Sequence, residues 1–118
     1  MKEKDLTIEE FKTLLLEERL DEDTIEDCLI MRTLDILNGK WKSYVIYELS
    51  KKKSCRFSEL KKAIPKITNT MLTSSLRELE SIGVVYREQF NEIPPHVEYS
   101  LTQKGEALLP IFYEIYKW

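Results

Sequence analysis

The segment from Arg56 to Val85, RFSELKKAIPKITNTMLTSSLRELESIGVV, constrains the fold more than any other part of the chain. Glu59 to Ile64 predicts a short helix, which Pro65 ends because proline cannot continue the backbone hydrogen bonding. A second helix is predicted to begin near Asn69, and a strand follows Gly83. Two short helices that are joined by a tight turn and lead into a strand are typical of a helix-turn-helix.

The second of these helices, Asn69 to Ser81, has two chemically different faces. One face carries apolar residues at i, i+4 and i+7 that must point to a core, namely Leu72, Leu76 and Leu79. The opposite face is short, hydrogen-bonding and free of carboxylates, and it consists of Thr70, Thr73, Ser74, Arg77 and Ser81. Such a face suits the major groove of DNA, where acidic side chains would meet phosphate charge.

The distribution of charge supports a nucleic-acid partner, although the formal net charge is −3. Residues 1–27 hold eleven acidic and four basic residues, a net charge of −7, so the remainder carries +4. Between Lys51 and Arg77, eight basic residues oppose only Glu59, which gives a net charge of +7. This local excess is the pattern expected of a surface that contacts phosphates. The alternative is a merely solvated lysine face.

The bulk composition excludes several classes of protein. With 118 residues, 42% hydrophobic and 33% charged, the chain is predicted to form one compact soluble domain with extra elements for packing or assembly. No apolar run reaches the roughly 18 residues of a membrane span, and the acidic N-terminal region is unlike a signal peptide, so we expect a cytoplasmic protein. Cys28, Cys55 and His96 cannot supply four ligands to a structural zinc ion, and a reducing compartment disfavours a disulfide. We therefore expect no metal and no cofactor.

The N-terminal part is predicted to be helical. Leu6 to Leu20 reads as an amphipathic helix that Thr7 caps, with Glu10 three residues later. A short helix should run from Met31 to Leu37, with Leu34 and Leu37 facing inward, and end near Asn38-Gly39.

A longer helix and a short strand are predicted to lead into the helix-turn-helix. The apolar positions of the longer helix are Trp41, Val45, Ile46 and Leu49. Cys55 to Phe57 predicts a short strand, in which Cys55 belongs to the core, and Ser58 is placed to cap the helix that follows.

After Gly83 the hydrophobic period changes to two, which predicts a hairpin of residues 84–90 and 96–101. The loop Asn91 to Pro95 is stiffened by its prolines, and a protruding hairpin beside a recognition helix is a wing. Thr102 should cap a final helix through Trp118, which Pro110 should kink. This helix carries two apolar stripes, Leu108, Ile111, Phe112 and Ile115 on one and Leu109, Tyr113 and Tyr116 on the other.

Together these residues resemble the HxlR-type winged helix-turn-helix family of bacterial transcription regulators, relatives of the MarR-type regulators, from about Cys28 to Trp118. The pieces that carry the resemblance are Leu34-Asp35, Gly39-Lys40-Trp41, Arg56-Phe57-Ser58-Glu59-Leu60, Met71-Leu72-Thr73, Leu76-Arg77-Glu78-Leu79-Glu80, and Pro94-Pro95-His96-Val97-Glu98-Tyr99-Ser100-Leu101-Thr102 with Gly105. The resemblance implies a homodimer that binds a roughly palindromic operator in double-stranded DNA. The helix from Asn69 to Ser81 would enter the major groove, and the wing would lie near the adjacent minor groove.

The resemblance also assigns the DNA-binding residues. Those of the recognition helix are Thr68, Asn69, Thr70, Thr73, Ser74 and Arg77, and those of the wing are Arg87 and His96. Candidates for sequence-independent phosphate contacts are Lys40, Lys42, Lys61, Lys62 and Lys66. Arg77 is the strongest single candidate, since a guanidinium can pair with a guanine edge or clamp a phosphate. The alternative is that Arg77 pairs with Glu78, Glu80 or Glu88 and organises the fold.

Cys28 lies where members of the family that sense oxidants or electrophiles place a reactive thiol near the dimer interface. Such chemistry needs a stabilised thiolate, because the thiolate is the nucleophile. The adjacent Glu26 and Asp27 oppose this, whereas the start of the next helix, Arg32 or Lys40 would favour it. Leu29 also replaces the proline that usually follows this cysteine in the family. The interpretations left open are a redox-sensing thiol and a silent one.

These observations combine into an α+β, mainly helical fold, a winged helix-turn-helix with added N- and C-terminal dimerisation helices. Residues 1–27 form the acidic N-terminal helix and turn, 28–101 the DNA-binding domain, and 102–118 the C-terminal dimerisation helix. A second copy of the chain is the simplest cover for the spare apolar stripe, together with Phe11, Leu14 and Leu15. The alternative is a larger monomeric core.

The predicted function is a DNA-binding transcription regulator, with an oxidant, an electrophile or another small molecule as its effector if one exists. We do not expect an enzyme, because the sequence holds no glycine-rich phosphate loop, no nucleophile motif paired with histidine and no metal-ligand cluster. The serious alternative is a winged-helix module for protein contacts only. The basic segment and the Thr/Ser/Arg face favour DNA, since a protein-binding surface built on hydrophobic anchors would not require them.

Overall fold

The computed structural model describes residues 5–25, 28–35 and 38–118. Contacts divide the chain into two compact units, residues 1–36 and residues 37–118. Each unit is described by itself. In the part of the chain that the structure describes, no helix is long and apolar enough to span a bilayer.

The first unit contains α1 (Ile8–Glu17) and α2 (Leu29–Leu34). Thr7 caps α1 as predicted, because its hydroxyl oxygen accepts a hydrogen bond from the Glu10 N–H at 3.2 Å. α1 is shorter than the predicted segment from Leu6 to Leu20, and neither helix has a fully buried residue among those described.

The predicted limits of α2 are wrong. The helix begins at Leu29 because the carboxylate of Glu18 accepts a hydrogen bond from the Leu29 N–H, at 2.9 and 3.1 Å from its two oxygens. Leu34, expected to face inward, is 52% exposed in its last turn. Leu37 lies outside the described residues.

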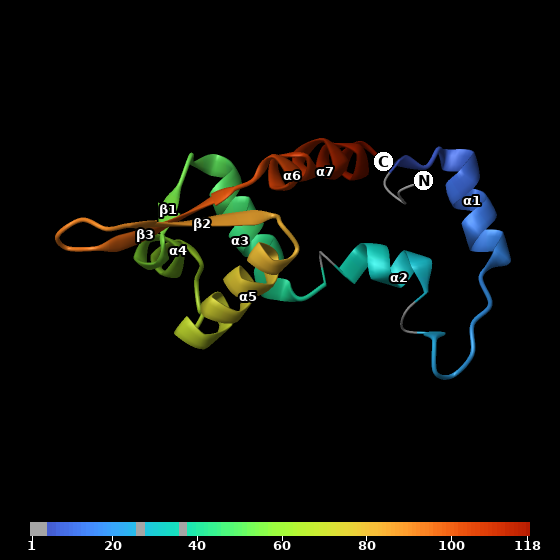
Figure 1. The fold of residues 1–118 in the computed structure, drawn as a ribbon, viewed down its shortest axis with the longest axis horizontal. Helices are drawn as coiled ribbons and strands as arrows, with labels where there is room; N and C mark the ends of the chain where they lie inside the picture. The colour runs from blue at the N-terminus through green and yellow to red at the C-terminus, as the bar shows by residue number, and fades with distance from the viewer. Residues whose placement is uncertain (1–4, 26–27, 36–37) are drawn as a thin grey trace. The chain divides into compact units, whose positions relative to one another are not determined.

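The second unit contains three helices, a small sheet and two C-terminal helices (Figure 1). Their bounds are α3 (Lys40–Lys51), β1 (Cys55–Arg56), α4 (Phe57–Ala63), α5 (Asn69–Ser81), β2 (Val85–Phe90), β3 (His96–Leu101), α6 (Gln103–Glu106) and α7 (Leu108–Lys117). The sheet is antiparallel with the order β1-β3-β2. The hairpin of β2 and β3 extends away from the helices as a wing. The predicted winged-helix fold is confirmed, as are the limits of α5 and the pairing of the hairpin.

The core of this unit lies between α3, α4, α5 and the sheet. Its buried residues are Val45, Ile46, Leu49, Cys55, Leu60, Ile64, Ile67, Leu72, Leu76, Leu79, Val84 and Val85. The leucines of α5 therefore point inward as their spacing predicts, and the opposite face of the helix is turned to solvent.

The predicted cap of α4 is wrong. Ser58 is exposed inside the helix, whose N-cap is Arg56. The Glu59 carboxylate accepts a hydrogen bond from the Arg56 N–H at 2.9 Å, and this bond stabilises a start one residue before Ser58.

The turn between α4 and α5 contains Pro65 and Lys66. As predicted, Pro65 follows the end of α4. Lys66 has a φ of 68°, a left-handed conformation that costs a side chain such as lysine about 1–2 kcal/mol.

The C-terminal segment is two helices rather than one helix kinked at Pro110. The break lies at Ala107, which precedes α7. Pro110 has no N–H to donate to the carbonyl of Glu106 and its ring would crowd that carbonyl, so the chain restarts as a new helix with Pro110 in the first turn.

A tight joint connects the end of α5, the start of β2 and the start of α6. Gly83, with a φ of 80°, follows α5, and the next N–H, that of Val84, bonds back to the carbonyl of Leu79 at 2.9 Å. The Thr102 hydroxyl donates to the backbone carbonyl of Gly83, and its oxygen accepts from the Gly105 N–H at 3.0 Å. Gly105 is buried, with no room for a side chain against the Val84 carbonyl.

Candidate DNA-binding surface

α5 is held in place at its start by Thr68. The hydroxyl oxygen of Thr68 accepts a hydrogen bond from the Met71 N–H at 3.1 Å, so this residue caps the helix. Asn69 and Thr70 then lie exposed in the first turn. Thr68 is thus a structural residue at the edge of the candidate surface as well as one of its predicted members.

The polar face of α5 carries a shallow hollow of about 430 Å³. It is lined by Asn69, Thr70, Thr73, Ser74, Arg77 and Glu78. The structure therefore brings together the predicted residues of the recognition helix that follow Thr68. The face is not free of carboxylates, however, because Glu78 borders it. Ser81 contributes less than predicted, since its hydroxyl donates to the Glu78 carbonyl at 2.7 Å.

Arg77 is exposed and reaches toward the wing. Among the described residues it forms no ion pair, so the alternative in which it pairs with Glu78, Glu80 or Glu88 has no support. It shares a second hollow, of about 360 Å³, with Arg87 of β2 and Tyr99 of β3. Glu80 also lines this hollow. The fold thus places two arginines from consecutive elements, α5 and β2, at the junction of the helix and the sheet.

His96 is held within the wing. It is 15% exposed, its ring stacks on Phe90 with 4.6 Å between centroids, and its Nε2 lies 2.9 Å from a Glu98 oxygen. The Ser54 hydroxyl donates to the other Glu98 oxygen at 2.7 Å. These two hydrogen bonds, that of Ser54 before that of His96, hold the pKa of Glu98 below its usual value. In this arrangement His96 fastens the loop end of the hairpin, where it pairs with Phe90.

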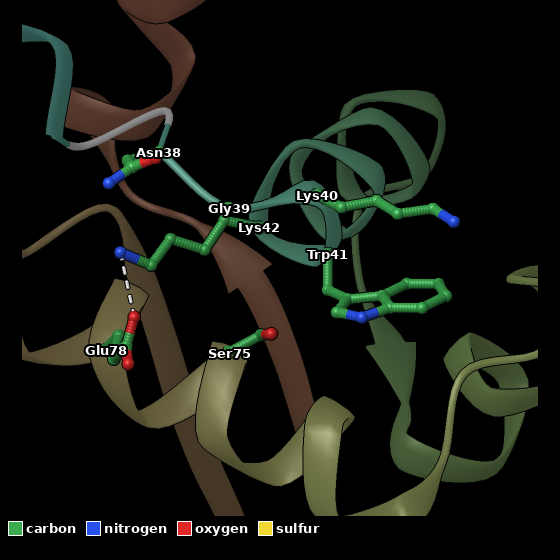
Figure 2. A pocket seen from close by; sticks show the side chains of 7 residues that line it. All are labelled: Asn38, Gly39, Lys40, Trp41, Lys42, Ser75 and Glu78. Atoms are coloured by element: carbon green, nitrogen blue, oxygen red, sulfur yellow. Dashed lines mark ion pairs between the residues drawn. The ribbon is translucent and has the colours of Figure 1, made fainter.

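The predicted lysines differ in how their charges are engaged. Lys61 is half-buried, while Lys62 and Lys66 are exposed near α4. The Lys40 ammonium lies over the Trp41 ring at 4.8 Å from its centroid. The Lys42 ammonium is 2.8 Å from a Glu78 oxygen, in an ion pair between α3 and α5 that Figure 2 shows. Lys42 is therefore engaged by the protein rather than open to solvent.

The two cysteines lie in different surroundings. Cys55 is buried in the core as predicted, and burial raises the pKa of its thiol. Cys28 is half-buried at the N-cap of α2 and is a free thiol. The carboxylate of Glu18 occupies the first N–H of that helix. The neighbours Glu26 and Asp27 lie outside the described residues. Within the described ranges no group of three or more histidine, cysteine or acidic side chains could hold a metal ion.

α7 presents a broad apolar face. Leu108 and Phe112 pack against the core. The other large apolar side chains are 43% to 100% exposed, and these are Leu109, Ile111, Tyr113, Ile115, Tyr116 and Trp118. The sequence predicted this excess of apolar surface, and the unit 37–118 does not cover it.

Sequence reasoning missed the ion pair of Lys42 with Glu78 and the left-handed turn at Lys66. Lys42 and Glu78 are 36 residues apart in the sequence, so their spacing gives no indication that the two side chains meet. A lysine at positive φ likewise has no sequence signature, since glycine or asparagine is usual there.

Comparison with known proteins agrees with this architecture. Residues 36–118 match the model of the HxlR-like helix-turn-helix family. The chain is 48% identical over 96 residues to the uncharacterized HTH-type transcriptional regulator YdeP of Bacillus subtilis, covering 81% of this chain and 74% of that protein. An HTH-type transcriptional regulator of Methanothermobacter thermautotrophicus is 47% identical over 77% of this chain and 69% of its own length.

Solved structures give the same result. The redox regulator HypR in its oxidized form has a TM-score of 0.69 and 44% identity over 77% of this chain and 93% of that one. The reduced form of the transcriptional regulator YodB from B. subtilis has a TM-score of 0.70 and 36% identity over 77% and 89%. With the winged-helix fold and the polar face of α5 in place, these matches show that the chain belongs to the HxlR-like helix-turn-helix family of transcriptional regulators.

Proposed function

We propose that this regulator binds a roughly palindromic operator in double-stranded DNA as a homodimer. The observation that carries the proposal is the shared surface of α5 and the wing, where Arg77 and Arg87 line one hollow and Arg77 forms no ion pair with the described residues. The first turn of α5 would offer amide and hydroxyl groups to base edges. Arg87, in strand β2 of the wing, would contact the DNA backbone.

The exposed apolar face of α7 supports the homodimer. Side chains as exposed as Ile115 (55%) and Tyr116 (83%) stay in water in a monomer, and a two-fold partner that presents the same face would cover them. A dimer also binds two half-sites at once, which raises its affinity for the operator. Its two-fold symmetry corresponds to that of a palindromic site. The acidic helix α1 remains a proposed part of this assembly.

Selection of bound fragments from a random duplex pool tests DNA binding and half-site symmetry together. On the selected operator, Arg77→Ala should weaken binding by about 1–3 kcal/mol and relax the preference at one base pair of each half-site. Lys62→Ala serves as the contrast. Loss of a phosphate contact should weaken binding to all DNA sequences alike, and it should lower the slope of log affinity against log salt concentration by about one. An unchanged affinity in Arg77→Ala would remove this residue from the interface.

The oligomeric state is tested separately by sedimentation. The parent chain should sediment as a dimer, and Ile115→Asp should yield monomers that bind the operator more weakly. If the folded dimer binds no duplex DNA even in dilute buffer, the DNA-binding proposal is wrong and a role in protein contacts takes its place.

A response to oxidants through Cys28 is the second candidate function. It is favoured by the likeness to the redox regulator HypR and by the free, half-buried thiol at the start of α2. Cys55 is a poor candidate because it is buried in the core.

A further inference from the structure

We propose that Lys42 supports DNA binding indirectly, by holding Glu78 and cancelling its charge at the edge of the reading face of α5. The inference rests on the proposed function, and it gives Lys42 a positioning role in place of the phosphate contact predicted from the sequence.

The geometry turns Lys42 toward the protein. Lys42 lies in the first turn of α3, and its ammonium is 2.8 Å from an oxygen of Glu78 on α5. The lysine side chain is 17% exposed, whereas that of Glu78 is 55% exposed. In Figure 2 the Lys42 side chain extends away from the start of α3 and meets the Glu78 carboxylate on α5. The exposed partner is thus the acid, and the shielded partner is the base.

Glu78 places a negative charge at the edge of the proposed DNA-binding face. It lines the same hollow as Asn69, Thr70, Thr73, Ser74 and Arg77, and it is the one carboxylate among the described residues around this hollow. When DNA binds to this face, its phosphates come close to the edge of the face, where they would repel an uncompensated carboxylate. The ammonium of Lys42 removes that repulsion before DNA arrives.

This arrangement predicts that removing Lys42 and removing Glu78 have different effects on operator affinity. Lys42→Met leaves a bare carboxylate, and operator affinity should fall about fivefold at low salt, as expected for one added repulsion near the duplex. Glu78→Gln breaks the same ion pair but leaves a cation, so affinity should not fall. The double variant carries neither charge and should return to within about twofold of the parent.

Two other roles for Lys42 give different patterns. A direct phosphate contact would leave the double variant as weak as Lys42→Met, because removing Glu78 cannot replace the lost cation. A purely structural tie between α3 and α5 would make both single variants bind equally weakly, since each breaks the same pair. Lys42→Arg is the matched control, because it keeps the charge and the partner and should bind like the parent.

The experiment measures fluorescence anisotropy of the selected operator with these five full-length proteins at about 50 and 200 mM salt, with thermal unfolding as a check of folding. Recovery of affinity in Lys42→Met/Glu78→Gln, with an undiminished Glu78→Gln, supports the proposal. An unrecovered double variant, or equal losses in both single variants, overturns it. If the parent itself binds no duplex, the proposed function fails and this inference falls with it, and that outcome is distinct from a wrong pattern among binding proteins.

Discussion

Gly105→Ala should destabilise the second unit even though alanine is the better helix former. Gly105 lies in α6, and a Cβ there would be 2.3 Å from the Val84 carbonyl oxygen and 3.2 Å from a side-chain carbon of Leu101. The same carbonyl accepts a hydrogen bond from the Thr102 N–H at 3.0 Å, so it cannot move away freely. Real Cβ atoms essentially never approach closer than 3.0 Å.

The expected loss follows from two opposing effects. Replacing glycine by alanine in an open helix gains about 1 kcal/mol, while overpacking of a tight site costs about 1–3 kcal/mol and occasionally more. Because the contact is with backbone rather than a flexible side chain, we place the steric cost at or above the top of that range. The net loss is then about 2 kcal/mol, or roughly 8–16 °C in Tm for a unit of this size.

The assay is thermal and urea unfolding at a fixed protein concentration, since a dimer makes Tm depend on concentration. Gln103→Ala is the control, because it lies at an exposed position of the same helix and should change stability little. A Gly105→Ala protein as stable as the parent would refute the claim that this glycine is required by the close approach of the Val84 carbonyl.

The remaining predictions concern the turn, the wing and the free thiol. Lys66→Gly should stabilise the fold by up to about 1 kcal/mol, because glycine adopts the left-handed backbone without strain. It should nevertheless lower operator affinity, because it removes a candidate phosphate contact. A loss of both stability and affinity would contradict this prediction. The pKa of Glu98 is lower in the folded protein than its usual value, so its stabilising effect is present above the ordinary glutamate range and is lost as pH falls through the lowered pKa. Urea midpoints should therefore decline in acid, and Glu98→Gln should flatten that decline, while parallel curves for both proteins would exclude Glu98 as a cause. If Cys28 senses oxidants, diamide should alter operator binding in the parent and not in Cys28→Ser, and identical responses would assign the effect elsewhere.

The parts of the fold that could be predicted from sequence are those governed by local periodicity. The limits of α5 followed from Leu72, Leu76 and Leu79, and those of β3 from the alternation after Pro95. Segments whose limits depend on contacts distant in sequence were predicted less well. α2 begins where Glu18, eleven residues earlier, reaches the Leu29 N–H.

The candidate site shows the same division. The residue types on the outer face of α5 follow from helical spacing, and they line one hollow as expected. The partners of charged side chains do not follow from spacing, because an ion pair needs only that two groups meet in space. Lys42 and His96 are therefore the two predicted DNA contacts whose surroundings differ most from expectation.

The joint formed by Thr102, Gly83 and Gly105 would affect half-site spacing in the proposed homodimer. It fastens the chain at the end of α5 to the chain that enters α6, and Lys104 adds a further bond to the Ile82 carbonyl at 2.7 Å. In the proposed homodimer through α7, the hydrogen bonds at this corner would help to set the separation and angle of the two α5 helices. Under that proposal, altering the corner would change the distance between operator half-sites that the dimer accepts, while the residues proposed to contact bases stay the same.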